Sequence, residues 1–181
     1  MTDGEFERFH AETAGPLHAY LARVGGGESL ADDLVQSAYL RFLGARRQPE
    51  DPQARRVYLF RIARNLLRDE FRRQAKERRQ ATRFGTESAP GGGVAYGGGG
   101  EEGEVQGLTC ESRIDVRRAF GALGARDREL LWLAYVTGLS HREIAKVARV
   151  GESSVRVLLY RARRRFSKVL DGSGIGPEDL A

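Results

Sequence analysis

A glycine-rich, acidic stretch at residues 84–112 places the strongest constraint on how this 181-residue chain can fold. The stretch holds ten glycines, including Gly97–Gly100, and has no amphipathic period. Such a segment cannot offset the entropy lost on ordering by burying apolar surface, so we expect a flexible linker, with a passive tether as its simplest role. The chain is therefore predicted to form two small domains, residues 1–83 and 113–170, followed by a tail over 171–181.

The net charge of +5 conceals an uneven distribution of charge along the chain. Residues 55–83 hold 11 basic and 3 acidic residues, and residues 113–170 hold 14 basic and 5 acidic residues. The remaining segments, 1–54, 84–112 and 171–181, are all net acidic. Two separate basic blocks indicate an anionic partner, such as nucleic acid or a membrane surface.

Several classes of protein are disfavoured by what the sequence contains. No apolar run approaches the roughly 18 residues needed to span a bilayer, and the N-terminus is acidic, unlike a signal peptide, so we expect a cytoplasmic protein with no membrane insertion. The single cysteine, Cys110, rules out an internal disulfide. The three histidines, His10, His18 and His141, belong to no recognisable metal-ligand or nucleophile–base pattern, so we expect no metal, no cofactor and no enzymatic activity.

The apolar spacing of the first domain predicts helices, and the whole chain is predicted to be all-α. Thr2 and Glu5 have the spacing of a capping box, and the helix that they begin should end at Gly25–Gly27. A second helix is predicted from Ser29 to about Gly44, with its core face formed by Leu30, Leu34, Val35, Ala38, Tyr39 and Phe42. Its opposite face mixes acidic, polar and apolar residues, namely Asp32, Asp33, Gln36, Leu40 and Leu43. Such a face suits a protein partner, although an ordinary solvated helix face is an equal alternative.

Asp51 and Pro52 predict the start of a third helix, because they form an N-cap followed by proline at the first helical position. The residues expected to face the core are Tyr58, Leu59, Ile62, Ala63 and Leu66. Arginines fall within an arc of about 80° along one edge, with Asn65 on its flank; they are Arg61, Arg64, Arg68 and Arg72. This spacing suits a phosphate backbone, and a solvated basic face is the alternative.

The second domain follows the plan of a helix-turn-helix. Ser112 and Asp115 have the spacing of a capping box and suggest where its first helix begins. Further along the chain, the pattern predicts a short capped helix over 140–148, a break at 149–151 and a longer helix from about Ser153. In the long helix, the predicted core residues are Val155, Leu158, Leu159, Ala162, Phe166, Val169 and Leu170. The opposite side is basic and holds Arg156, Tyr160, Arg161, Arg164 and Lys168. Val157 interrupts that side, where it could contact a thymine methyl group or simply be a tolerated surface valine.

Three motifs in this order resemble those of bacterial extracytoplasmic-function (ECF) sigma factors of the sigma-70 superfamily. The first is Asp32-Asp33-Leu34-Val35-Gln36, and the second runs from Tyr58 to Asp69. The third comprises Gly138-Leu139-Ser140, Glu143-Ile144-Ala145 and Arg161-Ala162-Arg163. The resemblance implies two helical domains on a flexible tether that deliver core RNA polymerase to promoter DNA.

The resemblance also implies roles for individual residues. The polymerase β′ clamp would be bound by Asp32, Asp33, Gln36, Leu40 and Leu43, and the β subunit would be a further contact. The minus-10 element, including a base flipped into the 46–53 loop, would be bound by Gln48, Asp51, Arg55, Arg56, Arg61, Arg64, Asn65, Arg68 and Arg72. The minus-35 element would be read by Ser153, Ser154, Arg156, Val157, Tyr160, Arg161 and Arg164. The acidic linker would thread the nucleic-acid channels of polymerase, and an anti-sigma protein is a further candidate partner.

At several positions this sequence departs from the family pattern, and each departure predicts a difference from the family. Ser37 stands where the family usually has glutamate, which weakens the acidic contact, and Tyr58 replaces a tryptophan, which suggests a change confined to the core. Arg149 occupies a turn position that is normally glycine, so Gly151 is expected to reshape the turn. Val157 and Leu158 replace a polar pair, which predicts more methyl contact with the minus-35 element and fewer hydrogen bonds.

Two other functions compete with this interpretation. A stand-alone helix-turn-helix regulator would bind duplex DNA without polymerase, but it would not need an arginine edge beside an acidic partner face. A small nucleic-acid-processing enzyme is disfavoured, because neighbouring carboxylates such as Asp32 and Asp33 diverge on a helix.

Overall fold

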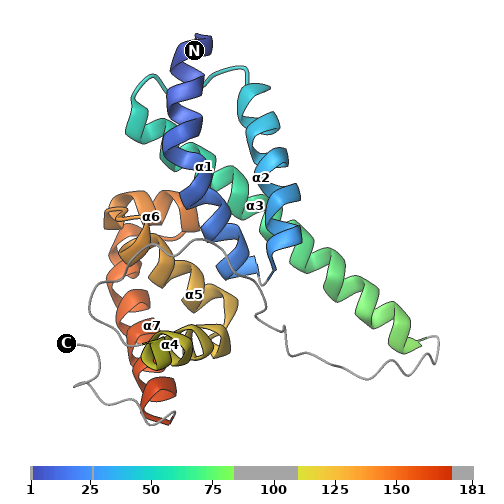
Figure 1. Ribbon diagram of the computed structural model, residues 1–181, viewed down its shortest axis with the longest axis vertical. Helices are drawn as coiled ribbons and strands as arrows, with labels where there is room; N and C mark the ends of the chain where they lie inside the picture. The colour runs from blue at the N-terminus through green and yellow to red at the C-terminus, as the bar shows by residue number, and fades with distance from the viewer. Residues whose placement is uncertain (1, 26, 84–109, 173–181) are drawn as a thin grey trace. The chain divides into compact units, whose positions relative to one another are not determined.

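The computed structural model describes residues 2–25, 27–83 and 110–172, which lie in two compact units, Met1–Ala95 and Tyr96–Ala181. Every regular element in these ranges is a helix (Figure 1), so the predicted all-α class is confirmed. Most of the predicted linker, residues 84–109, lies outside the described residues, as do the tail residues 173–181. The side chains of 81–83 and 110–115 are likewise outside the description.

Unit 1 consists, in the described residues, of α1 (Asp3–Gly25), α2 (Glu28–Leu43) and α3 (Pro52–Arg83), and α1 and α2 run antiparallel (Figure 1). The predicted capping box of α1 is present: the Thr2 backbone N–H donates to Glu5 Oε2 at 2.8 Å, and the Glu5 N–H donates to Thr2 Oγ1 at 3.3 Å. α1 ends where it approaches α3, because a Cβ on Gly25 would lie 2.9 Å from Leu67 Cδ1. A side chain at this position would require the end of the Leu67 side chain to shift, so glycine allows the closest approach of the two helices.

The core of unit 1 is formed by aromatic contacts between the helices. The rings of Phe9 on α1 and Phe42 on α2 stack with centroids 5.0 Å apart, and Tyr20 on α1 meets Phe60 on α3 at 5.5 Å. On α2, the predicted core residues Leu34, Ala38, Tyr39 and Phe42 are buried, while Leu30 and Val35 are half-buried. The predicted core face of α2 is thus largely confirmed.

The core face of α3 differs from the predicted one. Leu59, Ala63 and Leu66 are buried as expected, but Tyr58 and Ile62 are only half-buried. Instead, three residues absent from the prediction, Val57, Phe60 and Leu67, are buried. The reason is that α3 packs against both α1 and α2, so its buried arc is wider than one partner would produce, with Tyr58 at its border.

Unit 2 consists, in the described residues, of α4 (Cys110–Ala122), α5 (Ala125–Leu131), the π-helical turn η1 (Trp132–Val136), α6 (His141–Ala148) and α7 (Glu152–Gly172). α7 packs against α4, α5 and α6. Its predicted core side is confirmed, since Val155, Leu159, Ala162 and Leu170 are buried and Leu158, Phe166 and Val169 are half-buried.

The predicted cap of the first helix in unit 2 was wrong. α4 begins at Cys110, within the predicted linker, so Ser112 lies inside the helix. Serine is tolerated in a helix, so nothing in the Ser112–Asp115 pattern stops the helix from starting earlier.

The turn between α6 and α7 also corrects a prediction. Ser140 caps α6 with both bonds of a capping box, as expected, and the helix ends at Arg149 with φ 52° and ψ 51°. Arg149 therefore adopts the left-handed conformation itself, and Gly151 does not reshape the turn. The conformation is retained because the Arg149 and Val150 N–H groups both donate to the Ala145 carbonyl, which satisfies the end of α6.

Candidate nucleic-acid and protein interfaces

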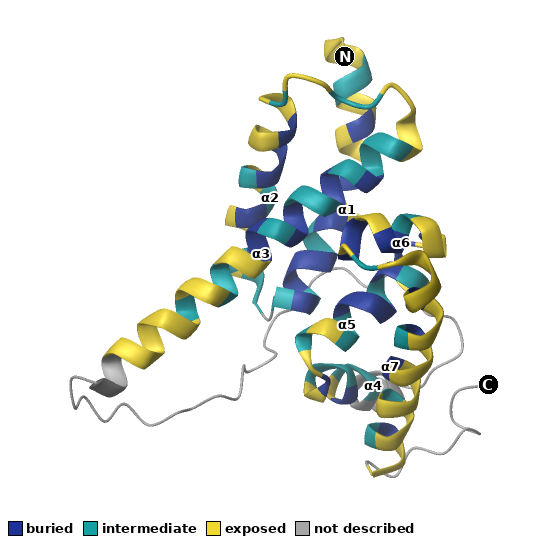
Figure 2. Ribbon diagram, turned by 180° about the vertical axis from the view of Figure 1, so that it is seen from behind, coloured by how far each residue is buried: buried dark blue, intermediate teal, exposed yellow. Residues whose placement is uncertain are grey.

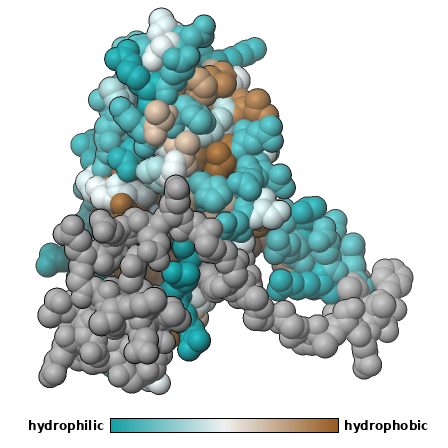
Figure 3. All heavy atoms as spheres, in the orientation of Figure 1, coloured by the Kyte–Doolittle hydropathy of each residue, from teal (hydrophilic) through white to brown (hydrophobic). Residues whose placement is uncertain are grey.

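The outer face of α2 is exposed where the sequence predicts a partner surface (Figure 2). Asp32, Asp33 and Gln36 are exposed, and two leucines on the same face, Leu40 and Leu43, are 65% and 46% exposed. Figure 3 shows hydrophobic side chains interspersed among hydrophilic ones on this part of unit 1. The structure therefore brings these five residues onto one accessible surface.

One residue of this surface comes from α1 and was missed by sequence reasoning. His18 Nε2 lies 3.0 Å from Asp32 Oδ1. No local signal in the sequence links His18 to Asp32, so only the packing of α1 against α2 brings the two together.

A pocket of about 560 Å³ lies where the segment between α2 and α3 meets the start of α1. Gln48 and Arg55, both predicted site residues, line the pocket and are fixed by backbone contacts: Gln48 Nε2 donates to the Phe42 carbonyl at 3.0 Å, and Arg55 Nε donates to the Pro49 carbonyl at 2.8 Å. Asp51 caps α3 by accepting a 2.6 Å hydrogen bond from the Ala54 N–H. The full lining is Thr2, Asp3, Phe6, Leu43, Ala45, Arg46, Gln48, Pro49, Glu50 and Arg55.

Three of these lining residues, Thr2, Asp3 and Phe6, were not predicted. They are distant from the 46–53 loop in the sequence, and the only local signal at this position is the capping box. The volume of the pocket falls within the range of small-ligand sites.

The arginine edge of α3 is interrupted in the structure. Arg68 and Arg72 are exposed, and Arg61 is half-buried with its guanidinium carbon 4.9 Å from the centroid of the Tyr58 ring. The Tyr58 ring also lies 5.9 Å from the ring of the buried Phe42, so Tyr58 stands at the border between the core and the arginine edge. Arg64, predicted to belong to the exposed edge, is only 8% exposed, because it falls within the wider arc that α3 buries.

Two other predicted residues near the arginine edge are partly exposed to solvent. Asn65 and Arg56 are half-buried. Asp69 lies 3.6 Å from Arg72 in an exposed ion pair, which is worth little because solvent screens both charges.

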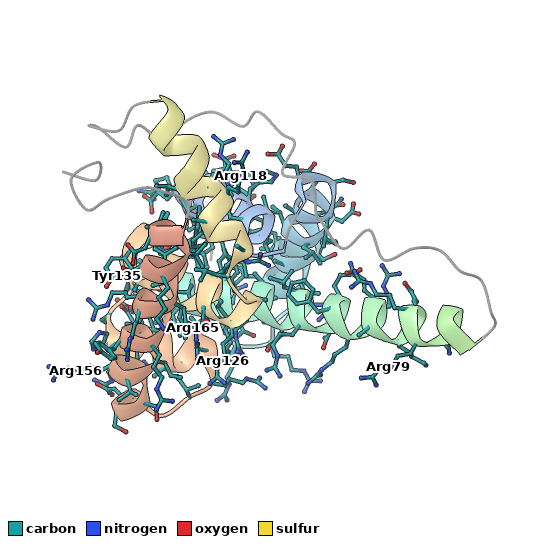
Figure 4. All side chains as sticks on the ribbon, turned by 90° about the horizontal axis from the view of Figure 1, so that it is seen from below. Arg79, Arg118, Arg126, Tyr135, Arg156 and Arg165 are labelled. Carbon is teal, nitrogen blue, oxygen red and sulfur yellow. The ribbon has the colours of Figure 1, made fainter. Side chains whose placement is uncertain are left out.

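The outward side of α7 carries all of the predicted groove-reading residues. The exposed residues are Ser153, Ser154, Arg156, Val157, Tyr160, Arg161 and Arg164. Val157 is 49% exposed, as expected for an apolar residue on the basic side. Figure 4 shows Arg156 projecting outward from α7.

Arg165 differs from its neighbours because its side chain joins α7 to α5. Its Nη1 lies 2.9 Å from both carboxylate oxygens of Asp127 on α5. The sequence does not indicate this pair, because the two residues are 38 positions apart.

The π-helical turn exposes two large side chains that periodicity did not single out. Tyr135 and Val136 are each 60% exposed. A π-turn shifts the register of the residues that follow, so a helical wheel misplaces them.

Within 2–25, 27–83 and 110–172, no helix is both long and apolar enough to cross a bilayer. The same residues contain no group of three or more histidine, cysteine or carboxylate side chains placed to hold a metal ion.

Comparison with known proteins agrees with this arrangement. Residues 10–77 match sigma-70 region 2, and residues 113–166 match sigma-70 region 4. The ECF RNA polymerase sigma factor EcfG of Rhodopseudomonas palustris is 28% identical over 90% of this chain and 85% of its own. The RNA polymerase sigma factor CnrH of Cupriavidus metallidurans is 30% identical over 80% of this chain and 75% of its own.

A solved structure shares the fold. The sigma factor RpoE from Bartonella quintana, crystallised in complex with the anti-sigma factor NepR, matches with a TM-score of 0.62 and 20% identity, covering 92% of this chain and 97% of that one. The two-unit helical fold and the two sequence matches define a sigma factor of the sigma-70 type. The chain belongs to the ECF group of that family.

Proposed function

We propose that this ECF sigma factor binds core RNA polymerase and directs it to promoters by recognising minus-10 and minus-35 elements. One combination of features supports the proposal: a single chain presents an exposed face that is both acidic and apolar, a pocket beside a cationic edge, and a basic helix of a helix-turn-helix. A stand-alone duplex-binding regulator would require only the last of these.

The exposed face of α2 is the proposed contact with the β′ clamp. Its leucines, Leu40 and Leu43, would lose water-exposed apolar area on binding, and the carboxylates of Asp32 and Asp33 would pair with basic groups. Ser37 adds no charge to this face, so the apolar contribution carries more of the affinity than in relatives with glutamate there. The β subunit is a further proposed contact.

The pocket is the proposed site for a base extruded from the minus-10 element. Phe6 supplies a ring for stacking, and the Gln48 amide and Glu50 carboxylate supply hydrogen-bonding groups for a base edge. Arg61, Arg68 and Arg72 would hold the phosphates of the opened strand and of the adjoining duplex. Melting then needs no covalent chemistry, because binding the extruded base shifts the equilibrium toward the open state.

The basic side of α7 is the proposed reader of the minus-35 element. Arg156 and Arg161 offer guanidinium donors to base edges and phosphates, and Val157 offers a methyl contact to thymine. Tethering this helix to the polymerase-bound unit 1 would raise its effective concentration at the promoter.

Val157 gives this assignment a direct test. Val157→Ser removes the proposed thymine contact, so preference for thymine at one minus-35 position should fall by about 1 kcal/mol, roughly fivefold. The measurement is transcription from a set of promoters that differ at single minus-35 positions. Lys168→Gln, on the same side but toward the end of α7, is the control, and unchanged base preference in Val157→Ser would remove the thymine contact from the proposal.

The acidic linker and the cellular setting complete the proposal. We infer that the linker threads the nucleic-acid channels of polymerase, because a negatively charged chain is attracted to the same basic walls as nucleic acid. The factor would act in the cytoplasm, where polymerase and DNA are found. An anti-sigma protein is a proposed regulator, consistent with the complex of the related RpoE.

Run-off transcription with core polymerase and a library of upstream DNA tests the proposed function and reads out the promoter. We expect transcripts only when the factor is present, from templates that share two spaced elements. Tight binding of the isolated protein to promoter duplex, together with no binding to core polymerase, would instead favour the stand-alone regulator.

A further inference from the structure

The distal half of α3, residues 68–83, continues beyond the last buried residue of that helix, Leu67. From Arg68 to Gln80 every residue is exposed or half-buried, and Figures 1 and 2 show this part of α3 extending past α1 and α2. Figure 3 shows hydrophilic side chains over it. Core packing therefore does not account for its length.

The cationic edge of α3 continues along this extension. At about 100° per residue, Lys76 and Arg79 fall within the same arc of roughly 80° as Arg61, Arg68 and Arg72. Both residues are exposed, and Figure 4 shows Arg79 projecting outward from the distal end of α3. We call these five residues the basic stripe.

Two of the three acidic residues of the extension, Glu70 and Glu77, pair on a different side of the helix. Arg73 donates from Nε and Nη2 to the two carboxylate oxygens of Glu70, both at 2.9 Å, and its Nη1 lies 3.8 Å from Glu77 Oε1. The hydrogen bonds from Arg73 and Gln74 hold the pKa of Glu70 below its ordinary value. These pairs support an isolated helix, and they lie roughly 100° to 160° around the helix from the middle of the stripe.

The basic stripe is consequently left cationic. Among the described residues, no acidic side chain lies within ion-pair distance of Arg68, Lys76 or Arg79. Arg72 has a single exposed contact, with Asp69 at 3.6 Å. Cations aligned on one side of a self-supporting helix complement the phosphates of a nucleic-acid backbone.

We propose that Lys76 and Arg79 bind backbone phosphates of the promoter duplex immediately upstream of the minus-10 element. The inference rests on the proposed function, which sets Arg61, Arg68 and Arg72 on the opened strand and adjoining duplex. At 1.5 Å per residue, the seven residues from Arg72 to Arg79 add about 10 Å of helix, which matches roughly three base pairs at 3.4 Å each. The contact adds affinity without reading sequence, because phosphates are the same at every base pair.

The salt dependence of promoter binding measures these contacts. Holoenzyme is assembled from core polymerase and either wild-type factor, Lys76→Gln/Arg79→Gln, or the matched control Arg73→Gln/Arg78→Gln, which removes two charges from the same half of α3 outside the stripe. On a promoter taken from the library selection, the stripe variant should lower the slope of log affinity against log salt by about 2, and the control by much less. The charge-retaining variant Lys76→Arg/Arg79→Lys should keep the wild-type slope and separates loss of charge from loss of folding.

Neutral phosphates locate the contact on the DNA. Methylphosphonate linkages at three positions just upstream of the minus-10 element should weaken wild-type and control holoenzyme equally. The same linkages should hardly change the promoter affinity of the stripe variant, because that variant already lacks the phosphate contacts. The inference is overturned if the methylphosphonates lower the affinity of all three holoenzymes equally. It is also overturned if the stripe variant and the control have the same slope of log affinity against log salt.

The two levels of the proposal fail in different ways. If wild-type factor with core polymerase neither binds nor transcribes any selected promoter, the proposed function is wrong and the inference falls with it. If wild-type holoenzyme initiates normally but the stripe variant matches its control, only the inference is wrong.

Discussion

At the scale of single residues, Arg149 ends α6 in a conformation that L-residues seldom adopt. Its φ of 52° is the only positive φ of a non-glycine residue in the described chain. Glycine would remove the strain at this position but would also add entropy to the unfolded state, so the net gain is smaller than the strain.

We predict that Arg149→Gly raises the free energy of unfolding of unit 2 by about 1 kcal/mol. The single tryptophan, Trp132, lies in unit 2, so its fluorescence in urea reports this transition. Lys146→Gly, at an exposed position inside α6, is the control and should lower stability by about 1 kcal/mol. A loss of stability in both variants would contradict the assignment of strain to Arg149.

A buried hydroxyl pair makes the stability of unit 1 depend on alkaline pH. Tyr39 Oη lies 2.7 Å from Thr13 Oγ1, and Thr13 also donates to the Phe9 carbonyl at 2.5 Å. Burial raises the pKa of Tyr39 above its ordinary value of 10.0, while the hydrogen bond with Thr13 partly lowers it. Above about pH 10 the unfolded chain loses this proton while the folded chain keeps it, so rising pH favours unfolding.

We therefore expect the stability that Tyr39 contributes to be complete below pH 10 and to decline as the pH rises further. Tyr39→Phe should cost about 1 kcal/mol at pH 8, and this difference from wild type should shrink above pH 10. Urea unfolding followed by circular dichroism at several pH values measures this difference in the free energy of unfolding. Tyr160→Phe, at an exposed position, is the control. A constant difference across pH would show that Tyr39 titrates equally in both states.

At the scale of elements, the Asp127–Arg165 pair joins α5 to α7, the proposed groove-reading helix. Asp127 is largely buried and Arg165 is 59% exposed, so screening reduces the value of the pair to about 0.5–1 kcal/mol. Arg164, the preceding residue, is exposed and lies on the proposed DNA-binding side.

Two adjacent arginines should therefore separate stability from binding. Arg165→Gln is expected to lower the stability of unit 2 by about 0.5–1 kcal/mol, whereas Arg164→Gln should leave it unchanged. Promoter affinity should respond in the opposite order, with the larger loss in Arg164→Gln. Trp132 fluorescence in urea and holoenzyme binding measure the two effects, and equal behaviour of the variants in both assays would refute the division of roles.

The helix α3 illustrates what periodicity can and cannot predict for an element. Its start at Pro52 followed from local capping chemistry, and the exposed positions of Arg68 and Arg72 followed from helical spacing. Arg64 has the same spacing but is buried, because α3 has two packing partners and a helical wheel contains no information about how many partners a helix has. For the same reason the wheel did not predict that Tyr58 contacts both the buried Phe42 and the guanidinium of Arg61.

At the scale of the whole molecule, each unit has its own buried core. Phe60 in unit 1 and Ile144 in unit 2 are both fully buried. Truncating a large core side chain removes transfer energy and leaves a cavity, at a cost of roughly 2–5 kcal/mol.

We predict that the two cores respond separately in the intact chain. Phe60→Ala should reduce amide-exchange protection in α1–α3 and leave α5–α7 protected, and Ile144→Ala should do the reverse. Hydrogen exchange read by mass spectrometry resolves the two units in one experiment. Loss of protection in both units from either variant would mean that the cores are not independent.

Composition and local pattern were sufficient to determine that the chain is helical, where most of its helices begin, and which faces of α2 and α7 meet water. These properties depend on residues a few positions apart, whose relative placement a helix dictates. The tertiary structure alone decided that Arg64 is buried, that Thr2, Asp3 and Phe6 join Gln48 and Arg55 around one pocket, and that Arg165 binds Asp127 rather than facing DNA unpaired. Each of these depends on how helices distant in the sequence pack against one another, and the spacing of residues along one helix carries no record of that packing.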